Sequence, residues 1–314
     1  MLTLSSGQCK HSSHESAATR EQQVHAQMTV ATVITAKPKD LGGFQVRRAL
    51  PVAQLRAVGP FVFLDQMGPA RIPAGQGLDV RPHPHIGLST MTYLYEGEIL
   101  HRDSLGTVQP ISPGAINWML AGRGIVHSER SPSHLRAREH RLFGLQFWVA
   151  LPRAQEEAAP SFRHIDRDSV PALHEAGVDT RLLAGSMDGV AAPFNAPHPM
   201  ICVDFEMVAG AATRVSPGWP ERALYVSAGD VEIADARFSE GQLIVLAPGA
   251  EARLRALSNA RVMLIGGEPL DGPRHIWWNF VSSSQDRIEQ AKADWKAGRF
   301  AAVPGETEFI PLPD

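Results

Sequence analysis

Four side chains in the first half of the chain have the types and the spacing of metal ligands. His83 and His85 lie two residues apart in the segment RPHPH, and His127 and Glu129 have the same spacing after a glycine-rich turn. Alternate side chains of an extended segment point to the same side, so each pair can present two ligands to one point. Either pair alone is a weak signal, because a chain with 13 histidines and 33 acidic residues contains such pairs by chance.

An internal repeat connects the two pairs. Residues 95–99 (YEGEI) and 111–116 (ISPGAI) are matched in the second half by 227–231 (SAGDV) and 238–243 (FSEGQL). In both halves another glycine follows the second glycine after eight residues. Matching intervals of turn, strand and turn favour one β-unit used twice, although chance similarity between glycine-punctuated strands is the alternative. We therefore predict two related β-barrels.

The repeat indicates that only the first barrel carries a metal site. At the four equivalent positions the second half has apolar residues, namely Val215, Pro217, Leu254 and Ala256. We therefore predict one metal centre in the first barrel, with ligands His83, His85, His127 and Glu129. Three imidazoles and a carboxylate suit a divalent ion such as Fe(II), Mn, Ni, Cu or Zn, and the ligand types do not choose among them.

Short apolar runs broken by many of the 27 glycines and 24 prolines predict an all-β protein. The strands expected most clearly are Phe61–Leu64, Leu88–Tyr95, Phe143–Leu151, Met200–Met207, Ala223–Val226, Gln242–Leu246 and Arg261–Ile265. One helix is expected near the C-terminus, from Ser283 to Ala297, with Ser283 and Asp286 at its start and Gly298 after its end.

The chain is expected to divide into three parts. Residues 1–28 are polar and are predicted to be a disordered or non-native extension. Residues 29–153 are predicted to form the N-terminal barrel with the metal site. Residues 161–314 are predicted to form a C-terminal barrel without metal ligands, together with the C-terminal helix. The charged stretch AQEEAAP between them is the predicted linker.

Composition excludes several classes of function. The net charge of −3 argues against direct binding of nucleic acid. No apolar run approaches the roughly 18 residues of a membrane helix, so we expect no membrane partner. The two cysteines, Cys9 and Cys202, cannot form a disulfide framework or a thiolate metal site. A reducing compartment follows, and we expect a cytoplasmic protein.

The segment 65–129, with its motifs HPHIG and AGRGIVHSE, resembles the pirin family of the cupin superfamily. The flanking sequences GGFQVRR at 42–48, GLQFWV at 144–149 and WWNFV at 277–281 agree with this resemblance, which covers nearly everything after Met28. The resemblance implies a bicupin, two stacked antiparallel barrels of the jelly-roll type, with one iron, as Fe(II), in the first. The family's ligands correspond to the four predicted above, and their carboxylate, Glu129, belongs to the second motif.

The resemblance also implies a function. Several pirins are associated with quercetin 2,3-dioxygenase activity, which implies oxidative opening of a flavonol ring with O₂, with Glu129 as a catalytic residue that accepts the flavonol proton. The alternative is a non-enzymatic, iron-binding, redox-responsive regulatory protein that acts through protein partners. A third hypothesis is an isomerase or hydrolase for another metabolite, because cupin barrels host many chemistries.

Residues near the motifs carry weaker expectations. Three could line the pocket, although barrel packing is the commoner role for such residues: Gln146, Trp118 and Met119. Three others are expected to be structural, on a strand surface or hydrogen-bonded in the core, rather than catalytic: His101, Asp103 and His140.

Overall fold

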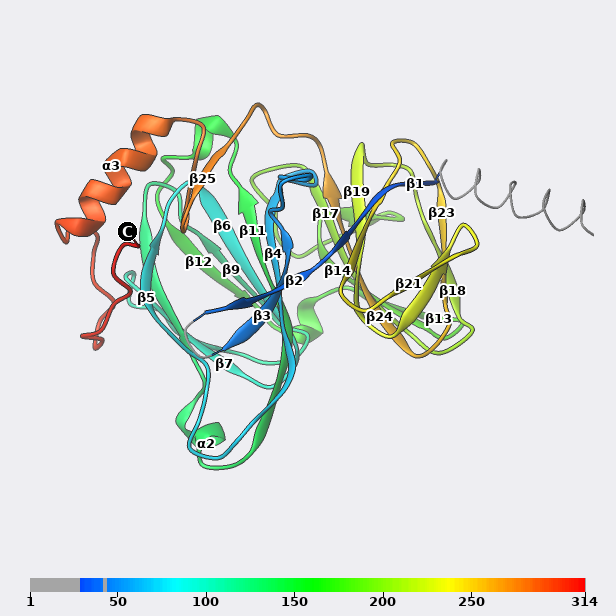
Figure 1. The fold of residues 1–314 in the computed structure, drawn as a ribbon, viewed down its shortest axis with the longest axis horizontal. Helices are drawn as coiled ribbons and strands as arrows, with labels where there is room; N and C mark the ends of the chain where they lie inside the picture. Colours follow the sequence, from blue (N-terminus) through cyan, green and yellow to red (C-terminus); the bar gives the residue numbers. More distant parts are fainter. Residues whose placement is uncertain (1–28, 42–43, 314) are drawn as a thin grey trace, which may run out of the picture.

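A computed structural model describes residues 29–41 and 44–313, and the expectation for residues 1–28 lies outside this part. The described chain forms two antiparallel β-barrels that lie side by side (Figure 1). The predicted all-β bicupin with a short C-terminal helix is confirmed. Among the described residues, none of the helices has the length and apolar character needed to span a bilayer.

The first barrel consists of a seven-stranded sheet and a four-stranded sheet. The larger sheet contains, in spatial order, β12 (Ser161–Ile165), β9 (Ile116–Leu120), β6 (Leu88–Glu96), β11 (His140–Ala150), β4 (Phe61–Ile72), β3 (Gln45–Leu50) and β2 (Lys37–Asp40). The smaller sheet contains β5 (Asp79–His85), β10 (Ile125–Arg130), β7 (Ile99–Asp103) and β8 (Val108–Ile111). A one-turn helix, α2 (Ser133–Arg136), precedes β11.

The second barrel repeats this arrangement strand for strand. Its larger sheet contains β1 (Val30–Thr35), β22 (Gln242–Leu246), β19 (Glu221–Ala228), β24 (Ala260–Gly267), β17 (Met200–Met207), β14 (Val178–Ala184) and β13 (Ala172–Glu175). Its smaller sheet contains β18 (Ala212–Val215), β23 (Ala252–Ala256), β20 (Asp230–Ile233) and β21 (Ala236–Ser239). A small hairpin, β15 (Ser186–Met187) and β16 (Val190–Ala191), lies outside both sheets. All seven strands predicted from apolar runs are present.

The turns of the two barrels correspond as the repeat predicts. Gly97 and Gly229, which end the equivalent strands β6 and β19, have φ values of 86° and 77°. This left-handed conformation is unfavourable for residues with a Cβ atom, which explains why glycine occurs at both positions.

The two barrels exchange strands. β1 comes first in the chain but pairs with β22 in the second barrel, and β12 follows the predicted linker but pairs with β9 in the first. Each exchanged strand covers an edge of a larger sheet that would otherwise expose unpaired backbone groups. The limits 29–153 and 161–314 stay predictions for the two units, but the hydrogen bonding crosses them in both directions.

The C-terminal segment returns to the first barrel. Helix α3 (Gln285–Lys296) is capped by Ser284, which accepts a hydrogen bond from the Arg287 backbone N–H, one residue later than the predicted start. A short hairpin, β25 (His275–Trp277) and β26 (Phe280–Ser282), leads into it. Ile288 and Ala291 of α3 belong to one apolar cluster with Ile86, the residue that follows β5. In Figure 1, α3 lies beside the first barrel. The helix was grouped with the second barrel by its position in the sequence, whereas its apolar face contacts the first.

Alternation along the strands divides the first barrel's larger sheet into two faces. Odd-numbered residues of β6 and β11, such as Tyr93 and Phe147, lie in an apolar core shared with the second barrel. Even-numbered residues such as Gln146 and Trp148 face the interior of the first barrel. Each strand therefore carries interface residues and site residues next to each other.

Several polar contacts cross the apolar interface, and two of them are fully buried. The Tyr225 hydroxyl donates to Gln66 Oε1 at 2.7 Å, and the Tyr93 hydroxyl donates to Asp204 Oδ2 at 3.0 Å. Arg261 also donates to Asp204 Oδ2, whereas the buried Asp204 Oδ1 has no hydrogen-bond partner in the described part of the chain. Burial raises the pKa of Asp204 to about 6, although the Arg261 charge acts in the opposite direction.

Asp204 is expected to make the fold less stable as the pH rises from about 4 to about 6. Its folded pKa lies above the ordinary value of 3.8, so in this window the folded state holds a proton that the unfolded chain has released. Below this window the Asp204 proton makes its full contribution to the free energy of unfolding. As the pH rises through the window, the free energy of unfolding falls by about 3 kcal/mol. Denaturant unfolding of the wild type and Asp204→Asn at about pH 4 and pH 7 checks this. In Asp204→Asn the free energy of unfolding should not fall by this amount between the two pH values.

The control for this experiment is Glu206→Gln, because Glu206 also contacts Arg261 but is exposed. Its free energy of unfolding should still fall over this pH window, by slightly less than in the wild type, because burial raises the pKa of Asp204 more than the Glu206 charge does. If Asp204→Asn also follows the wild-type curve, the raised pKa is wrong.

Candidate metal centre

The structure brings three of the four predicted ligands together. His83 and His85 lie on β5, and His127 lies opposite His83 on the neighbouring strand β10. One ring nitrogen from each lies within 4.8 Å of the others, and all three residues are buried. His85 Nε2 and His127 Nε2 are only 3.1 Å apart.

Hydrogen bonds at the far side of two rings determine their tautomers. His83 Nδ1 lies 2.9 Å from the carbonyl oxygen of Arg81, and His85 Nδ1 lies 3.0 Å from that of Asn279. A carbonyl oxygen can only accept, so both Nδ1 atoms carry the proton. The Nε2 atoms of both rings are therefore unprotonated, and each carries a lone pair.

A buried hydrogen-bonded chain of three side chains determines which nitrogen of His127 carries the proton. Asp103 Oδ2 lies 2.9 Å from His101 Nε2, and His101 Nδ1 lies 3.4 Å from His127 Nδ1. Burial acts to raise the pKa of Asp103, but hydrogen bonds from His101 and Thr107 outweigh it and keep the pKa below its usual value. The carboxylate thus accepts from His101 Nε2, His101 Nδ1 accepts from His127 Nδ1, and His127 Nε2 remains a lone pair.

Three convergent lone pairs fit one metal ion. With no proton between them, the two nitrogens 3.1 Å apart repel each other unless a cation lies between them. Metal–nitrogen bonds of about 2.0–2.1 Å place neighbouring ligand atoms about 3 Å apart. Burial lowers the pKa of His83 to about 4 and the pKa values of His85 and His127 well below 6.5. At neutral pH all three rings are therefore uncharged and available as ligands.

Glu129 lies in the wall of the same pocket but outside the group of three. A β-bulge between His127 and Glu129 shifts the register, so that Glu129 pairs with Val80. The bulge changes where the carboxylate points relative to the imidazoles. Thr92 Oγ1 lies 3.3 Å from Glu129 Oε1 and 2.8 Å from Gln146 Oε1. Burial raises the pKa of the Glu129 carboxyl. Its role as a fourth ligand stays a prediction.

The C-terminal hairpin reaches the histidines because of a close backbone approach at Gly87. Gly87 has a φ of 68°, and a Cβ there would lie 1.9 Å from the carbonyl oxygen of Val281. Trp278 also has a positive φ, 50°, in the turn that it forms with Asn279. This conformation is strained for tryptophan, and it occurs where the Asn279 carbonyl meets His85.

The three histidines lie in a cavity of about 370 Å³. Its wall is mainly apolar and aromatic, with few polar side chains. Besides the histidines, the lining residues are Leu41, Phe44, Val46, Arg48, Phe63, Asp65, Met67, Leu78, Val80, Glu129, Gln146, Trp148, Trp278, Asn279 and Ile310. Gln146 therefore lines the pocket, as considered from the sequence. Trp118 instead packs against Phe194 of the second barrel. Met119 belongs to the same apolar cluster as Phe63 and Trp148 but does not itself line the cavity.

Several pocket residues could not be found from the sequence. Trp278 and Asn279 lie about 190 residues after His85, and only the WWN motif pointed to them. Arg48 and Asp65 belong to β3 and β4, with no spacing that relates them to the histidines. His101 and Asp103 are buried and hydrogen-bonded, as expected from the sequence, and the chain that they form ends at His127.

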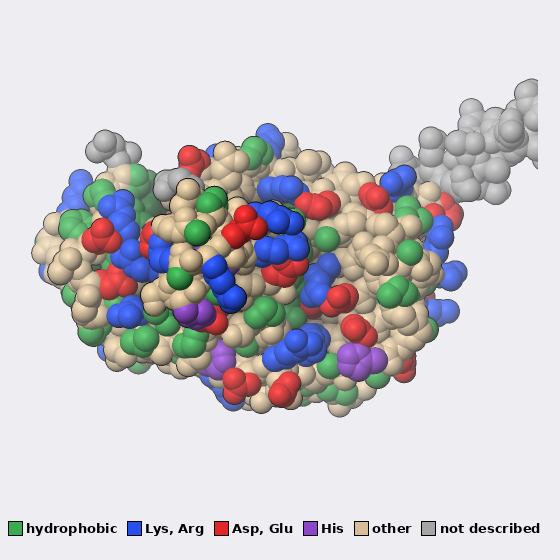
Figure 2. Space-filling view, turned by 90° about the horizontal axis from the view of Figure 1, so that it is seen from below, with side chains coloured by type: hydrophobic (Ala, Val, Ile, Leu, Met, Phe, Trp, Pro, Cys, Tyr) green, Lys and Arg blue, Asp and Glu red, His purple; other side chains and the backbone are tan. Residues whose placement is uncertain are grey.

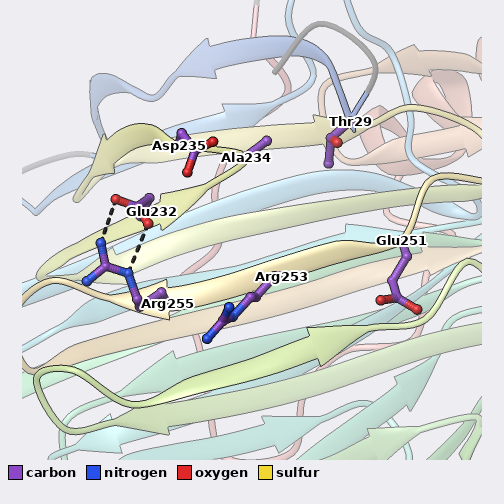
Figure 3. A pocket seen from close by; sticks show the side chains of 7 residues that line it. All are labelled: Thr29, Glu232, Ala234, Asp235, Glu251, Arg253 and Arg255. Carbon is purple, nitrogen blue, oxygen red and sulfur yellow. Dashed lines mark hydrogen bonds and ion pairs between the residues drawn. The ribbon is translucent and has the colours of Figure 1, made fainter. Parts of the chain in front are cut away.

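A second hollow lies on the second barrel and differs in character. It has a volume of about 320 Å³ and is lined by Thr29, Glu232, Ala234, Asp235, Glu251, Arg253 and Arg255 (Figure 3). Glu232 forms a bidentate pair with Arg255, and none of the described residues that line the hollow is a histidine. On the face of the molecule in Figure 2, acidic and basic side chains are likewise interspersed. The candidate chemistry therefore belongs to the first barrel.

Comparisons with known proteins agree with this architecture. Residues 43–149 match the family model described as Pirin, and residues 202–301 match the Pirin C-terminal cupin domain. A pirin-like protein of Caulobacter vibrioides is 50% identical over 286 residues, which cover 90% of this chain and 99% of that protein. A pirin-like protein of Arabidopsis thaliana is 32% identical, covering 81% of this chain and 84% of its own.

Solved structures give the same result. A crystal structure described as quercetin 2,3-dioxygenase from Acinetobacter baumannii superimposes with a TM-score of 0.85 at 32% identity and covers 93% of this chain and 97% of its own. A second structure with the same description and source has a TM-score of 0.82 at 25% identity, with 88% and 99% coverage.

Asp103→Asn is expected to weaken metal binding about ten- to hundredfold. Asp103 Oδ1 accepts from the backbone N–H groups of Leu105 and Thr107, so the new amide would turn its NH₂ group towards His101. His101 would then have to accept at Nε2 and donate from Nδ1, which opposes the tautomer that leaves His127 Nε2 free. Competition with a chelator for Co²⁺ or Zn²⁺ measures the affinity.

The matched control is Asp166→Asn, because Asp166 forms a similar pair with His164 but is 84% exposed. Its metal affinity should equal that of the wild type. Equal affinity in Asp103→Asn, with the fold intact, would show that the chain from Asp103 to His127 does not orient the ligand.

Proposed function

Because this chain belongs to the pirin family, we propose that it is a metal-dependent dioxygenase that opens the ring of a flavonol such as quercetin with O₂. The observation that carries the proposal is the convergence of three unprotonated Nε2 atoms within an aromatic-walled cavity that also contains a carboxylate. The cavity volume of about 370 Å³ lies within the range of small-molecule sites, about 300–1,000 Å³. The name of the 32% identical Acinetobacter structure supports the choice of substrate.

The metal would be held by His83, His85 and His127, with Glu129 as the fourth ligand, and we propose iron as the ion. When bound, it would act as a Lewis acid towards the hydroxyl and ketone oxygens of the flavonol. The overall reaction balances without another reductant, because one flavonol and one O₂ give one ring-opened ester and one carbon monoxide.

The side chains have separate tasks in this reaction. Glu129, partly exposed to the cavity, accepts the proton of the flavonol hydroxyl. The Thr92 hydroxyl, 3.3 Å from Glu129 Oε1, limits the positions of the carboxylate. Trp148 and Trp278 exclude water from the cavity and provide apolar surface for an aromatic substrate.

Iron-loaded protein is expected to consume quercetin under O₂ and to release carbon monoxide. Loss of the flavonol absorbance and headspace carbon monoxide measure the turnover. Glu129→Gln should reduce kcat about a hundredfold or more, because it removes the proton acceptor. The metal content of each protein is determined in the same samples, so that a lost ligand is distinguished from a lost base.

Glu139→Gln serves as the control, because Glu139 is exposed and pairs with Arg71 at the surface. Fully loaded wild-type protein that leaves quercetin unchanged would contradict the proposal. Affinity for a protein partner that changes between Fe(II) and Fe(III), without turnover, would instead support the regulatory alternative.

A further inference from the structure

The cavity wall contains an ion pair that the proposed chemistry does not use. Arg48 of β3 and Asp65 of β4 are opposite each other in the strand register. Arg48 Nε donates to Asp65 Oδ1 and Arg48 Nη2 donates to Oδ2, both at 2.9 Å. Asp65 is buried, and the Arg48 side chain is 26% exposed. The paired carboxylate fixes the plane of the guanidinium in the wall of the cavity.

A continuous row of rings connects this pair to the histidines. The Arg48 guanidinium carbon lies 4.5 Å from the centre of the Phe63 ring. Phe63 stacks on Trp148 at 4.0 Å, and Trp148 meets His85 edge to face at 5.2 Å. Both faces of Phe63 are therefore covered, and its edge is left for the cavity. Ring edges carry partial positive charge and attract the face of a flat aromatic ligand.

The ion pair leaves specific hydrogen-bonding groups unused. Arg48 Nη1 has no hydrogen-bond partner among the described residues, and its two N–H groups are donors. Because Asp65 compensates the charge of Arg48, the pair is a poor binding site for a full anion such as phosphate. It suits a neutral or weakly acidic oxygen that can accept from the guanidinium, as a phenolic hydroxyl does.

We infer that Arg48 is a specificity-determining residue that selects flat aromatic ligands with hydroxyl groups at the end remote from the metal. The ligand's chelating oxygens meet the three-histidine site, its rings lie along the edges of Trp148 and Phe63, and its remote hydroxyls accept from Arg48 Nη1. The inference rests on the proposed function, because it takes the metal end of the ligand from that reaction.

Binding of two flavonols tests the inference without turnover. Quercetin carries two hydroxyls on its pendant ring, and galangin is the same flavonol without them. With Zn²⁺-loaded protein, quenching of tryptophan fluorescence measures both dissociation constants. The wild type should bind quercetin about ten- to hundredfold more tightly than galangin, the range expected for hydrogen bonds to a charged donor. Arg48→Lys keeps a cation beside Asp65 but loses the planar fork, and it should lose most of this preference.

Two further variants separate specificity from folding. Arg47→Lys is the control, because the neighbouring Arg47 pairs with Glu240 of the second barrel and does not line the cavity. It should keep the wild-type preference. Arg48→Met combined with Asp65→Leu removes the pair without leaving a buried charge alone, so the fold should persist while the preference is lost. Thermal unfolding of each variant checks the fold.

The outcomes distinguish this inference from the proposed function. A wild type without preference for quercetin, or a preference that survives in both Arg48 variants, overturns the role of Arg48 even if quercetin is turned over. A preference that depends on Arg48 supports that role even if iron-loaded protein does not convert quercetin, and then only the proposed reaction fails. In the iron-loaded enzyme, Arg48→Lys should raise KM for quercetin towards that for galangin with little change in kcat.

Discussion

The site depends on three buried imidazole lone pairs that are held towards one point. Two of the Nε2 atoms are 3.1 Å apart, a distance that two acceptors do not tolerate without a cation between them. The arrangement persists because each Nδ1 proton has a fixed acceptor: the Arg81 carbonyl, the Asn279 carbonyl, and His101, which Asp103 holds in turn. The rest of the molecule can be understood as the framework that keeps these acceptors in place.

That framework extends beyond the first barrel. The Asn279 carbonyl comes from a C-terminal hairpin that is anchored beside β5 by the packing of α3. The second barrel supports the opposite wall. Tyr225 binds Gln66, the neighbour of Asp65, and Asp204 binds Tyr93, the neighbour of Thr92. Since adjacent residues on a strand face opposite sides, a contact in the interface holds a side chain in the cavity. The barrel without ligands thus stabilises the barrel that has them.

The cavity separates two kinds of recognition. At one end lie the three histidines of the candidate metal site and the Glu129 carboxyl group. At the other end Arg48, compensated by Asp65, supplies oriented donors with little net charge. The stacked rings of Phe63 and Trp148 connect the two ends. A ligand that satisfies both must be flat, aromatic and oxygenated at both ends, which is a narrower description than the metal site alone gives.

The barrel repeat and the three histidines can be recognised without coordinates, because both are local patterns. Period-two spacing places His83 with His85, and turn glycines recur at fixed intervals in both barrels. Three other features are visible only in the tertiary structure. They are the strand exchange, the return of α3 to the first barrel, and the acceptors of the Nδ1 protons. These depend on contacts between residues far apart in the chain, such as Asn279 with His85, for which no periodicity gives a signal. The position of Glu129 also required the structure, because a single bulge shifts the register between it and His127.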